Sequence, residues 1–267
     1  MWAQEQNAEL RDARDVVVGG GCAAWALPVD GTCAREARRR VREVMGALGF
    51  GSEVVGDVCT AVSEIGTNVF VHAYGGRAPS VTSPVGLPEL RIHLRNRRSE
   101  LVIKIFDTAA WRGPCPGRPP QAAPDDEGGR GGLEIVAALS RELNGAWGVQ
   151  RSRARLGSVA SPGKAVYFTV PLAGEYTRGR PVPQVPGCHA AVRLLEDELV
   201  ARGIGPVYRC EGWGMAVLSV RPEITLWART SGLLLTAPDT GTVRYPYDDI
   251  TELAEVVVQC NEDLDAR

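Results

Sequence analysis

Two polar side chains interrupt an otherwise apolar stretch of sequence at a spacing that could serve chemistry. The segment AVSEIGTNVFVHAY, residues 61–74, places Glu64 and Asn68 four residues apart, and His72 follows after four more. In a helix this spacing puts the side chains on one face, one turn apart. A carboxylate can accept a proton or orient a hydroxyl group, and a carboxamide oxygen can bind a hard cation. The pair could equally be the polar edge of a buried helix. Other segments of the chain must therefore distinguish a functional pair from a polar helix edge.

A carboxylate and a glycine-rich segment further along the chain could complete a site for a purine nucleotide. Asp107 ends a segment with the pattern of a strand, and EGGRGG (127–132) precedes a helical pattern that starts at Leu133. A carboxylate at a strand end can accept a hydrogen bond from the exocyclic amino group of adenine, whereas guanine has an acceptor there. Glycines before a helix let backbone N–H groups approach phosphates, which the positive end of the helix dipole favours.

The same interpretation gives a role to the polar residues of the first segment. Mg²⁺ bound to phosphates needs an oxygen ligand on a rigid element, which Asn68 could supply. A hydroxyl group that attacks the γ-phosphate needs a base or an orienting acceptor, which Glu64 could supply. We expect His72 to pack or to face the helix dipole, and we leave it out of the catalytic set. The candidates for contacts to the phosphates are Gly128, Gly129, Arg130, Gly131, Gly132 and Leu133.

Hydrophobic periodicity predicts the elements that would hold these groups. Helical spacing predicts helices over 33–49, from Ser52 to the Gly75-Gly76 pair, and over 133–143. Alternating residues predict strands in LPELRIHLRN (87–96), SELVIKIFD (99–107) and KAVYFTVP (164–171), the first two joined by a short hairpin connection at 96–99. Residues 16–29 are expected to be extended. Residues 108–131 hold five prolines and several glycines, which predicts a lid or a disordered segment.

Four segments in this order resemble a known family. SEIGTNVFVHAY, VIKIFDTAAW, EGGRGGLEIVAAL and GKAVYFTVP resemble the N, D and G boxes and the closing strand of the GHKL ATPase superfamily. The greatest resemblance is to bacterial anti-sigma regulatory serine/threonine kinases of the RsbW and SpoIIAB type. It covers about residues 22–172 and implies a Bergerat-type α/β sandwich, an antiparallel sheet with helices on one face, that binds ATP and Mg²⁺.

The resemblance also implies roles and partners. It implies that Glu64 is the catalytic base, Asn68 the Mg²⁺ ligand, Asp107 the adenine contact and the glycines of 128–132 the phosphate lid. A sigma factor and an anti-anti-sigma (STAS-like) protein are the implied partners, and a homodimer is compatible with it.

Some positions depart from the family pattern. The D box, residues 107–111, reads DTAAW where D-x-G-x-G is usual, so that residues with a Cβ atom replace glycines and the adenine pocket is expected to be reshaped. Ala165 stands where related proteins often have a threonine near the aspartate, and we expect one hydrogen bond, worth about 1 kcal/mol, to be absent. The G box has an extra glycine, which leaves open whether Gly129 and Gly131 or Gly131 and Gly132 take the two glycine roles.

The composition of the whole chain favours protein or small-molecule partners. Its 267 residues include 32 acidic and 30 basic side chains, so that a net charge of −2 draws it to neither nucleic acid nor an anionic membrane. The seven cysteines form no C-x-x-C pair that could hold zinc. The first residues, MWAQEQNAELRDARD, lack the apolar segment of a signal peptide, and we expect a soluble, cytoplasmic protein.

The length of the chain favours two domains and the pattern an α+β fold class. We expect an N-terminal tail (1–21), the ATP-binding domain (22–172), a linker (173–187) and a small α+β domain of unknown function (188–267). In the last domain the pattern predicts helices over 189–202 and 248–264, with strands near 206–210, 214–220, 224–229 and 232–236. Its Trp213, Trp227 and Tyr245 form either the core or an aromatic surface for a partner.

Three other patterns are expected to carry no function. Gly19, Gly21 and Ala24 have the spacing of a dinucleotide-binding turn, but the sequence WALP that follows favours an extended chain over the helix such a site needs. GSVASPGKA (157–165) lacks both the spacing and the helix of a P-loop. The arginines of 35–42 and 151–155 are expected to form a solvated helix face and a solvated loop.

Three functions remain open at this point. A protein kinase that phosphorylates a serine or threonine on an antagonist protein, and so controls a sigma factor, is favoured by Glu64. A catalytically weak regulator, in which the nucleotide changes the affinity for a partner, is favoured by the altered D box. A two-component histidine kinase ranks below both, because none of His72, His93 and His189 lies in a convincing dimerisation motif.

Overall fold

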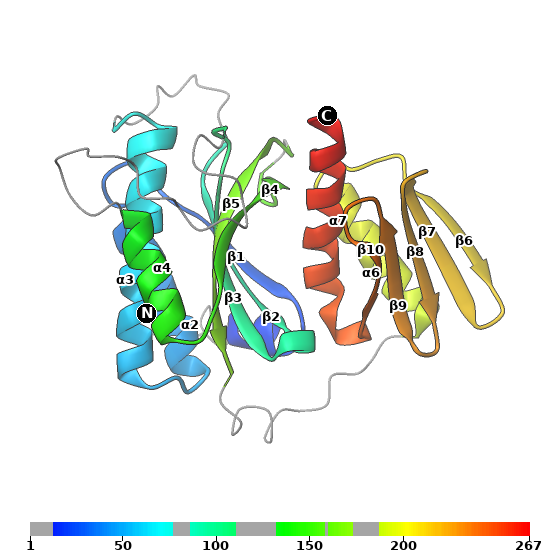
Figure 1. The fold of residues 1–267 in the computed structure, drawn as a ribbon, viewed down its shortest axis with the longest axis horizontal. Helices are drawn as coiled ribbons and strands as arrows, with labels where there is room; N and C mark the ends of the chain where they lie inside the picture. Colours follow the sequence, from blue (N-terminus) through cyan, green and yellow to red (C-terminus); the bar gives the residue numbers. More distant parts are fainter. Residues whose placement is uncertain (1–12, 77–85, 111–131, 158–159, 173–186) are drawn as a thin grey trace, which may run out of the picture.

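The computed structural model describes residues 13–76, 86–110, 132–157, 160–172 and 187–267. They form two five-stranded antiparallel sheets with helices, an α+β architecture (Figure 1). The first sheet has the strand order β1-β2-β3-β5-β4. Its strands are β1 (Cys22–Ala26), β2 (Glu89–Arg95), β3 (Glu100–Asp107), β4 (Trp147–Arg153) and β5 (Pro162–Pro171).

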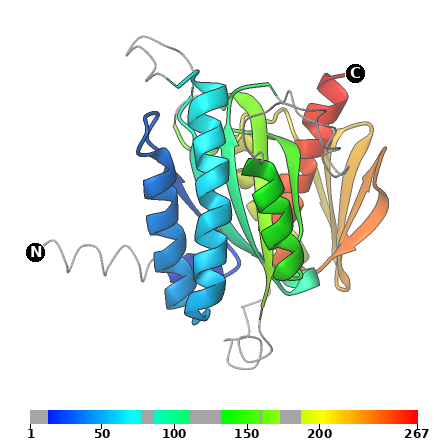
Figure 2. The same cartoon turned by 60° about the vertical axis from the view of Figure 1, so that its left-hand side comes forward.

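Three helices cover one face of the first sheet, as Figure 2 shows. They are α2 (Cys33–Ala47), α3 (Ser52–Asn68) and α4 (Gly132–Glu142). The π-helical turn η1 (Val69–Ala73) continues α3, and the 3₁₀ turn η2 (Asn96–Arg98) joins β2 to β3. Alternate residues of the strands pack against the apolar stripes of these helices because successive side chains of a strand point to opposite faces. The predicted antiparallel sheet with helices on one face is therefore confirmed.

The second sheet is a meander in which each strand pairs with the next, in the order β10-β9-β8-β7-β6. Its strands are β6 (Tyr208–Gly212), β7 (Met215–Arg221), β8 (Ile224–Arg229), β9 (Gly232–Ala237) and β10 (Gly241–Tyr245). The helix α6 (Cys188–Ala201) precedes them, and the turn η3 (Tyr247–Asp249) and the helix α7 (Ile250–Asp265) follow. Both helices pack their apolar residues against the second sheet in a separate core.

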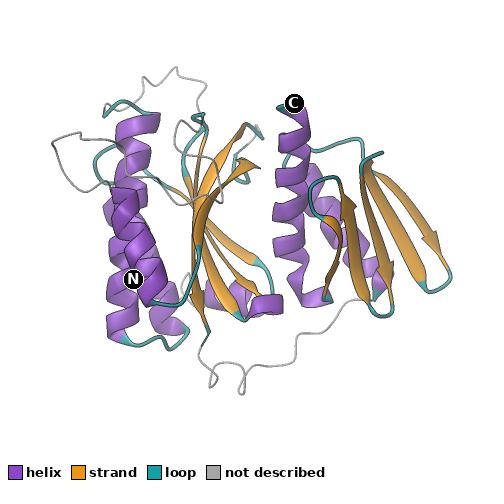
Figure 3. Ribbon diagram, in the orientation of Figure 1, coloured by secondary structure: helices purple, strands orange, loops and turns teal. Residues whose placement is uncertain are grey.

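The helix α7 lies between the two sheets (Figures 1 and 3). Its apolar residues Leu253, Val257 and Val258 belong to the core of the second sheet. Its carboxylates Glu252 and Glu255 face the first sheet, where Glu252 pairs with His93 of β2 at 2.9 Å and Glu255 with Lys104 of β3 at 3.3 Å. The face of the first sheet that α2, α3 and α4 leave uncovered is therefore covered by the C-terminal part of the chain.

Several sequence expectations need correction. Residues 13–18 are helical and Val17 is fully buried, so the extended chain expected from residue 16 begins only at Cys22. The strands β4 and β10 were not predicted at all. Of the three aromatic residues, Tyr245 is a core residue, whereas Trp227 is 36% exposed and Trp213 is fully exposed.

One helical segment, Ser52–Ala73, is long and apolar enough by length and composition to cross a membrane, and it is the one such segment among the described residues. A core helix meets the same criteria, and Val58, Val62 and Ile65 of this segment lie in the core of the first sheet.

Candidate functional site

Glu64 and Asn68 lie at the C-terminal end of α3, and Glu64 lies beside the start of α4. Both side chains are half-buried, and neither has a hydrogen bond to any of the described residues. A Cβ atom added to Gly132 would lie 2.5 Å from Oε2 of Glu64, so this carboxylate rests against the first residue of α4. Asn68 is the last residue before the π-helical turn η1, a type of segment that is frequent at functional sites.

The glycine segment falls largely outside the described residues. Gly128, Gly129, Arg130 and Gly131 all lie in the stretch 111–131, so their expected contacts to phosphates are untested. Gly132 and Leu133 are described and form the first turn of α4. The backbone N–H groups of such a first turn have no partner within the helix, and they point out of its N-terminus.

Asp107 is the last residue of β3 and is 1% exposed. Its Oδ1 accepts hydrogen bonds from the backbone N–H of Ala109 at 2.9 Å and from Nζ of Lys164 at 2.5 Å. Burial raises the pKa of Asp107, and the charge and hydrogen bond of Lys164 oppose that rise. Lys164 also donates to the carbonyl oxygen of Ala109 at 3.2 Å. The buried carboxylate is thus held by one cation and one backbone group.

Two further side chains lie close enough to feel the charge of Asp107. Burial and this charge raise the pKa of Tyr74 to about 12, and the Tyr74 hydroxyl donates to the carbonyl of Gly86 at 2.9 Å. Burial and the charges of Asp30 and Asp107 raise the pKa of the Cys33 thiol to about 11. The end of β3, the start of α2 and the segment after η1 are therefore close enough to interact electrostatically.

The register of β3 and β5 corrects the expectation for Ala165. Lys164 is the residue directly opposite Asp107, whereas Ala165 pairs with Phe106. Ala165 lies with Phe106 in a small cluster separate from the main core of the first sheet. The position directly opposite the aspartate thus holds the hydrogen-bond donor Lys164, and Ala165 faces away from it.

Sequence reasoning missed Lys164 and Tyr74 as members of this site. Tyr74 was part of the quoted motif but received no role. Lys164 lies 57 residues from its carboxylate partner, so only the strand register brings the two together. One signal was present: Lys104 and Lys164 are the two lysines of a chain in which lysine and arginine together number 30.

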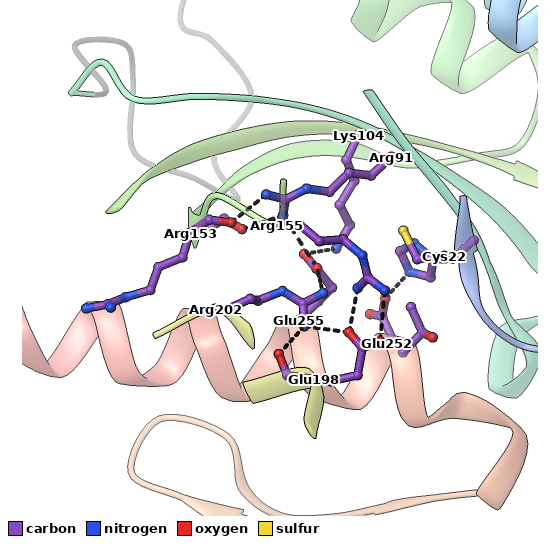
Figure 4. Close-up of polar contacts among 12 residues, drawn as sticks. Cys22, Arg91, Lys104, Arg153, Arg155, Glu198, Arg202, Glu252 and Glu255 are labelled. Atoms are coloured by element: carbon purple, nitrogen blue, oxygen red, sulfur yellow. Dashed lines mark hydrogen bonds and ion pairs between the residues drawn. The ribbon is translucent and has the colours of Figure 1, made fainter. Parts of the chain in front are cut away.

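The other face of the first sheet carries a network of buried charges, drawn in Figure 4. Glu255 of α7 lies 2.8 Å from Arg202, 3.3 Å from Lys104 and 3.5 Å from Arg91. Burial alone would raise the pKa of Glu255, but the charges of Lys104, Arg202 and Arg91 hold it well below its usual value. This network joins β2 and β3 to the C-terminal helices.

Arginines expected in a solvated loop take part in the same interface. Arg153 pairs with Glu262 at 2.5 Å and Arg155 with Glu198 at 2.5 Å, and all four side chains are at most 27% exposed. His93 lies fully buried with Nε2 2.9 Å from Oε2 of Glu252; burial lowers its pKa, and the hydrogen bond to Glu252 opposes that shift. These groups fix the C-terminal part of the chain to the first sheet.

Residues 27–154 match the family model of the histidine kinase-like ATPase domain. The match includes β2, β3, β4 and the three helices over them, and with them Glu64, Asn68 and Asp107. This part of the chain is therefore similar to ATPase domains of the GHKL type, and the similarity supports ATP binding. No curated protein matches the chain.

The described residues fit an adenine nucleotide. Oδ2 of Asp107 accepts no hydrogen bond from them and so can take an amino group, and Glu64 and Asn68 are without partners beside the start of α4. No group of three or more histidine, cysteine, aspartate or glutamate side chains among them could hold a metal ion. A bound Mg²⁺ would therefore take most of its ligands from phosphates and water, as this ion commonly does.

Proposed function

We propose that the protein is a cytoplasmic, ATP-dependent serine/threonine protein kinase of the anti-sigma type. Its substrate would be a STAS-like antagonist protein, and its regulated partner a sigma factor. The observation that carries this proposal is the position of Glu64, a carboxylate without a partner among the described residues that rests against the first residue of α4. The resemblance of residues 22–172 to anti-sigma kinases supplies the class of partner.

Each residue of the site has one task in this proposal. Asp107 accepts a hydrogen bond from the amino group of the base, and the first turn of α4 offers backbone N–H groups to phosphate oxygens. The Asn68 carboxamide oxygen binds Mg²⁺, which when bound neutralises charge on the phosphates. Glu64 accepts the proton of the attacking serine or threonine hydroxyl and orients its oxygen toward the γ-phosphate.

A catalytically weak, nucleotide-gated regulator is the second candidate. Two observations favour it: the D box lacks its glycines, and Lys164 already occupies Oδ1 of Asp107. In such a protein the nucleotide would change the affinity for a partner without phosphate transfer.

Phosphate transfer from labelled ATP separates the two candidates. The purified chain would be incubated with Mg²⁺ and candidate STAS-like proteins, beside the variants Glu64→Gln and Glu53→Gln. Glu53 is an exposed glutamate in the first turn of the same helix and serves as the matched control. The kinase proposal expects label transfer that only Glu64→Gln abolishes, by about 100-fold or more. Tight ATP binding with no transfer to any partner that forms a complex would favour the regulator.

A further inference from the structure

The residue opposite Asp107 bears on which base the nucleotide site accepts. Asp107 and Lys164 are a directly opposed pair in neighbouring strands, and such pairs lie on the same face of a sheet. Residues Ile103 and Ile105 of β3 belong to the core beneath the helices, and alternation puts Asp107 on that face as well. Lys164 therefore lies on the same face of the sheet as the carboxylate that should contact the base, and it contacts that carboxylate.

The hydrogen-bonding groups of this pair can be counted. A lysine ammonium has three donors, and two of them bond to Oδ1 of Asp107 and the carbonyl oxygen of Ala109. In Asp107, Oδ1 accepts from Lys164 and Ala109, and Oδ2 accepts from none of the described residues. The pair thus keeps one ammonium donor and one carboxylate oxygen without a partner among the described residues, whereas an aspartate alone offers only acceptors.

The edges of the two purines respond differently to these two arrangements. Adenine presents an N6–H donor beside the N1 acceptor, so it can donate to Asp107 and accept from Lys164. Guanine presents the O6 acceptor beside an N1–H donor, which is the reverse order, so it can accept from Lys164 and donate to Asp107 when it lies displaced from the adenine position in the plane of the base. An isolated carboxylate would place its lone pairs against guanine O6, which is also an acceptor, so neither oxygen would have a hydrogen bond. A site rejects an analogue when binding leaves buried polar groups unpaired in this way.

We propose that Lys164 is a specificity residue of the nucleotide site and that it lets the site bind guanine nucleotides as well as adenine nucleotides. The inference rests on the proposed nucleotide site at Asp107, and it names the range of bases which that site takes. Lys164 acts through its free donor and through its neutralising charge beside a buried carboxylate.

The test compares the dissociation constants of ADP and GDP, which cannot be consumed by phosphate transfer. Calorimetry with Mg²⁺ would be run on the unmodified chain, Lys164→Thr and Lys164→Arg. We expect the unmodified chain to bind the two nucleotides within about tenfold of one another. Lys164→Thr should shift the ratio by about tenfold or more toward ADP, mostly through weaker GDP binding, because one hydrogen bond is typically worth such a factor. Lys164→Arg keeps a charged donor and should keep the original ratio.

A second measurement uses the unmodified chain and so does not depend on the folding of a variant. Isotope labelling of lysine gives two side-chain NMR signals, one from Lys104, which is fully buried on the opposite face, and one from Lys164. Both ADP and GDP should shift the Lys164 signal and leave the Lys104 signal in place. The role of Lys164 is refuted if the unmodified chain and both variants bind ADP but discriminate equally strongly against GDP. It is also refuted if the Lys164 signal does not move at saturating nucleotide. Either result leaves the nucleotide site itself in place. If neither nucleotide binds at millimolar concentration, both the proposed nucleotide site and this inference are refuted.

Discussion

Replacement of Glu255 by glutamine tests how the C-terminal helices are held on the first sheet. Glu255 is buried among Arg91, Lys104 and Arg202, all of which are fully buried. Glutamine keeps the size of the side chain but removes its charge. The free energy of unfolding should therefore report the electrostatic part of the network.

The size of the expected loss in stability depends on the ion pairs that the three basic residues keep in Glu255→Gln. Arg91 keeps Glu89 at 2.7 Å, and Arg202 keeps Glu198 at 2.8 Å. Lys104 has no second carboxylate within ion-pair distance among the described residues, so it keeps only more distant negative charge such as that of Glu252. Loss of one partner of a buried pair typically costs about 3–5 kcal/mol, and we expect Glu255→Gln to fall in this range.

The assay is urea unfolding of the full chain, followed by circular dichroism and tryptophan fluorescence. Glu196→Gln is the matched control, because its pair with Arg209 is partly exposed and should contribute less than about 1 kcal/mol. Adding Lys104→Met to Glu255→Gln removes the uncompensated charge and should restore about 2 kcal/mol or more of the loss. The reasoning is refuted if Glu255→Gln behaves like the control, or if the double variant is no more stable than the single one.

Three further predictions concern pH, backbone space and the site. Lys104, His93 and Arg95 outweigh burial and lower the pKa of Glu252 to about 2, from 4.5. The ionised Glu252 carboxylate should contribute about 3 kcal/mol to the free energy of unfolding. This contribution should be complete above pH 4.5 and lost as the pH falls toward 2. Glu252→Gln should therefore make the free energy of unfolding depend less on pH over this range, which urea unfolding at a series of pH values measures. A Cβ atom on Gly163 would lie 2.2 Å from the carbonyl oxygen of Asp107, so Gly163→Ala should lower the stability by about 2 kcal/mol or more. Gly56 of α3 has open space around it, so Gly56→Ala should raise the stability by about 0.5–1 kcal/mol. Thermal unfolding of both variants checks these two values. Gly132→Ala should displace the Glu64 carboxylate and reduce phosphate transfer while the melting temperature stays nearly unchanged, and unaltered transfer would argue against the placement of Glu64.

The sequence predicted the part of the fold that obeys simple periodicity. The helical stripe of 52–73 and the alternation of LRIHLR and LVIKIF each follow one period, and α3, β2 and β3 appear where expected. The prediction placed Asp107 at the end of a strand and Glu64 one turn before Asn68, and both placements hold. Local pattern sufficed because each of these elements has one face in a purely apolar core.

One of the elements that were missed, β4, has polar residues buried by distant partners. In β4 the residues Gln150 and Ser152 are buried, and Arg153 pairs with Glu262, which lies 109 residues away. A strand of this kind shows no apolar alternation, so its sequence resembles a loop. Residues 13–18 contain three consecutive valines, 16–18, which favour a strand by propensity. The segment is nevertheless helical, and Val17 is buried in the core of the first sheet. The role of Lys164 depends on strand register, which periodicity does not contain.

The strand β3 serves both halves of the molecule at once. Asp107 lies on the side of the helices, and Lys104, three residues earlier, lies on the side of α7. The two residues are separated by about 10 Å along one rigid strand. The candidate base contact and the anchor of the C-terminal helices therefore stand on opposite faces of one strand, so a substitution that displaces β3 itself would disturb both.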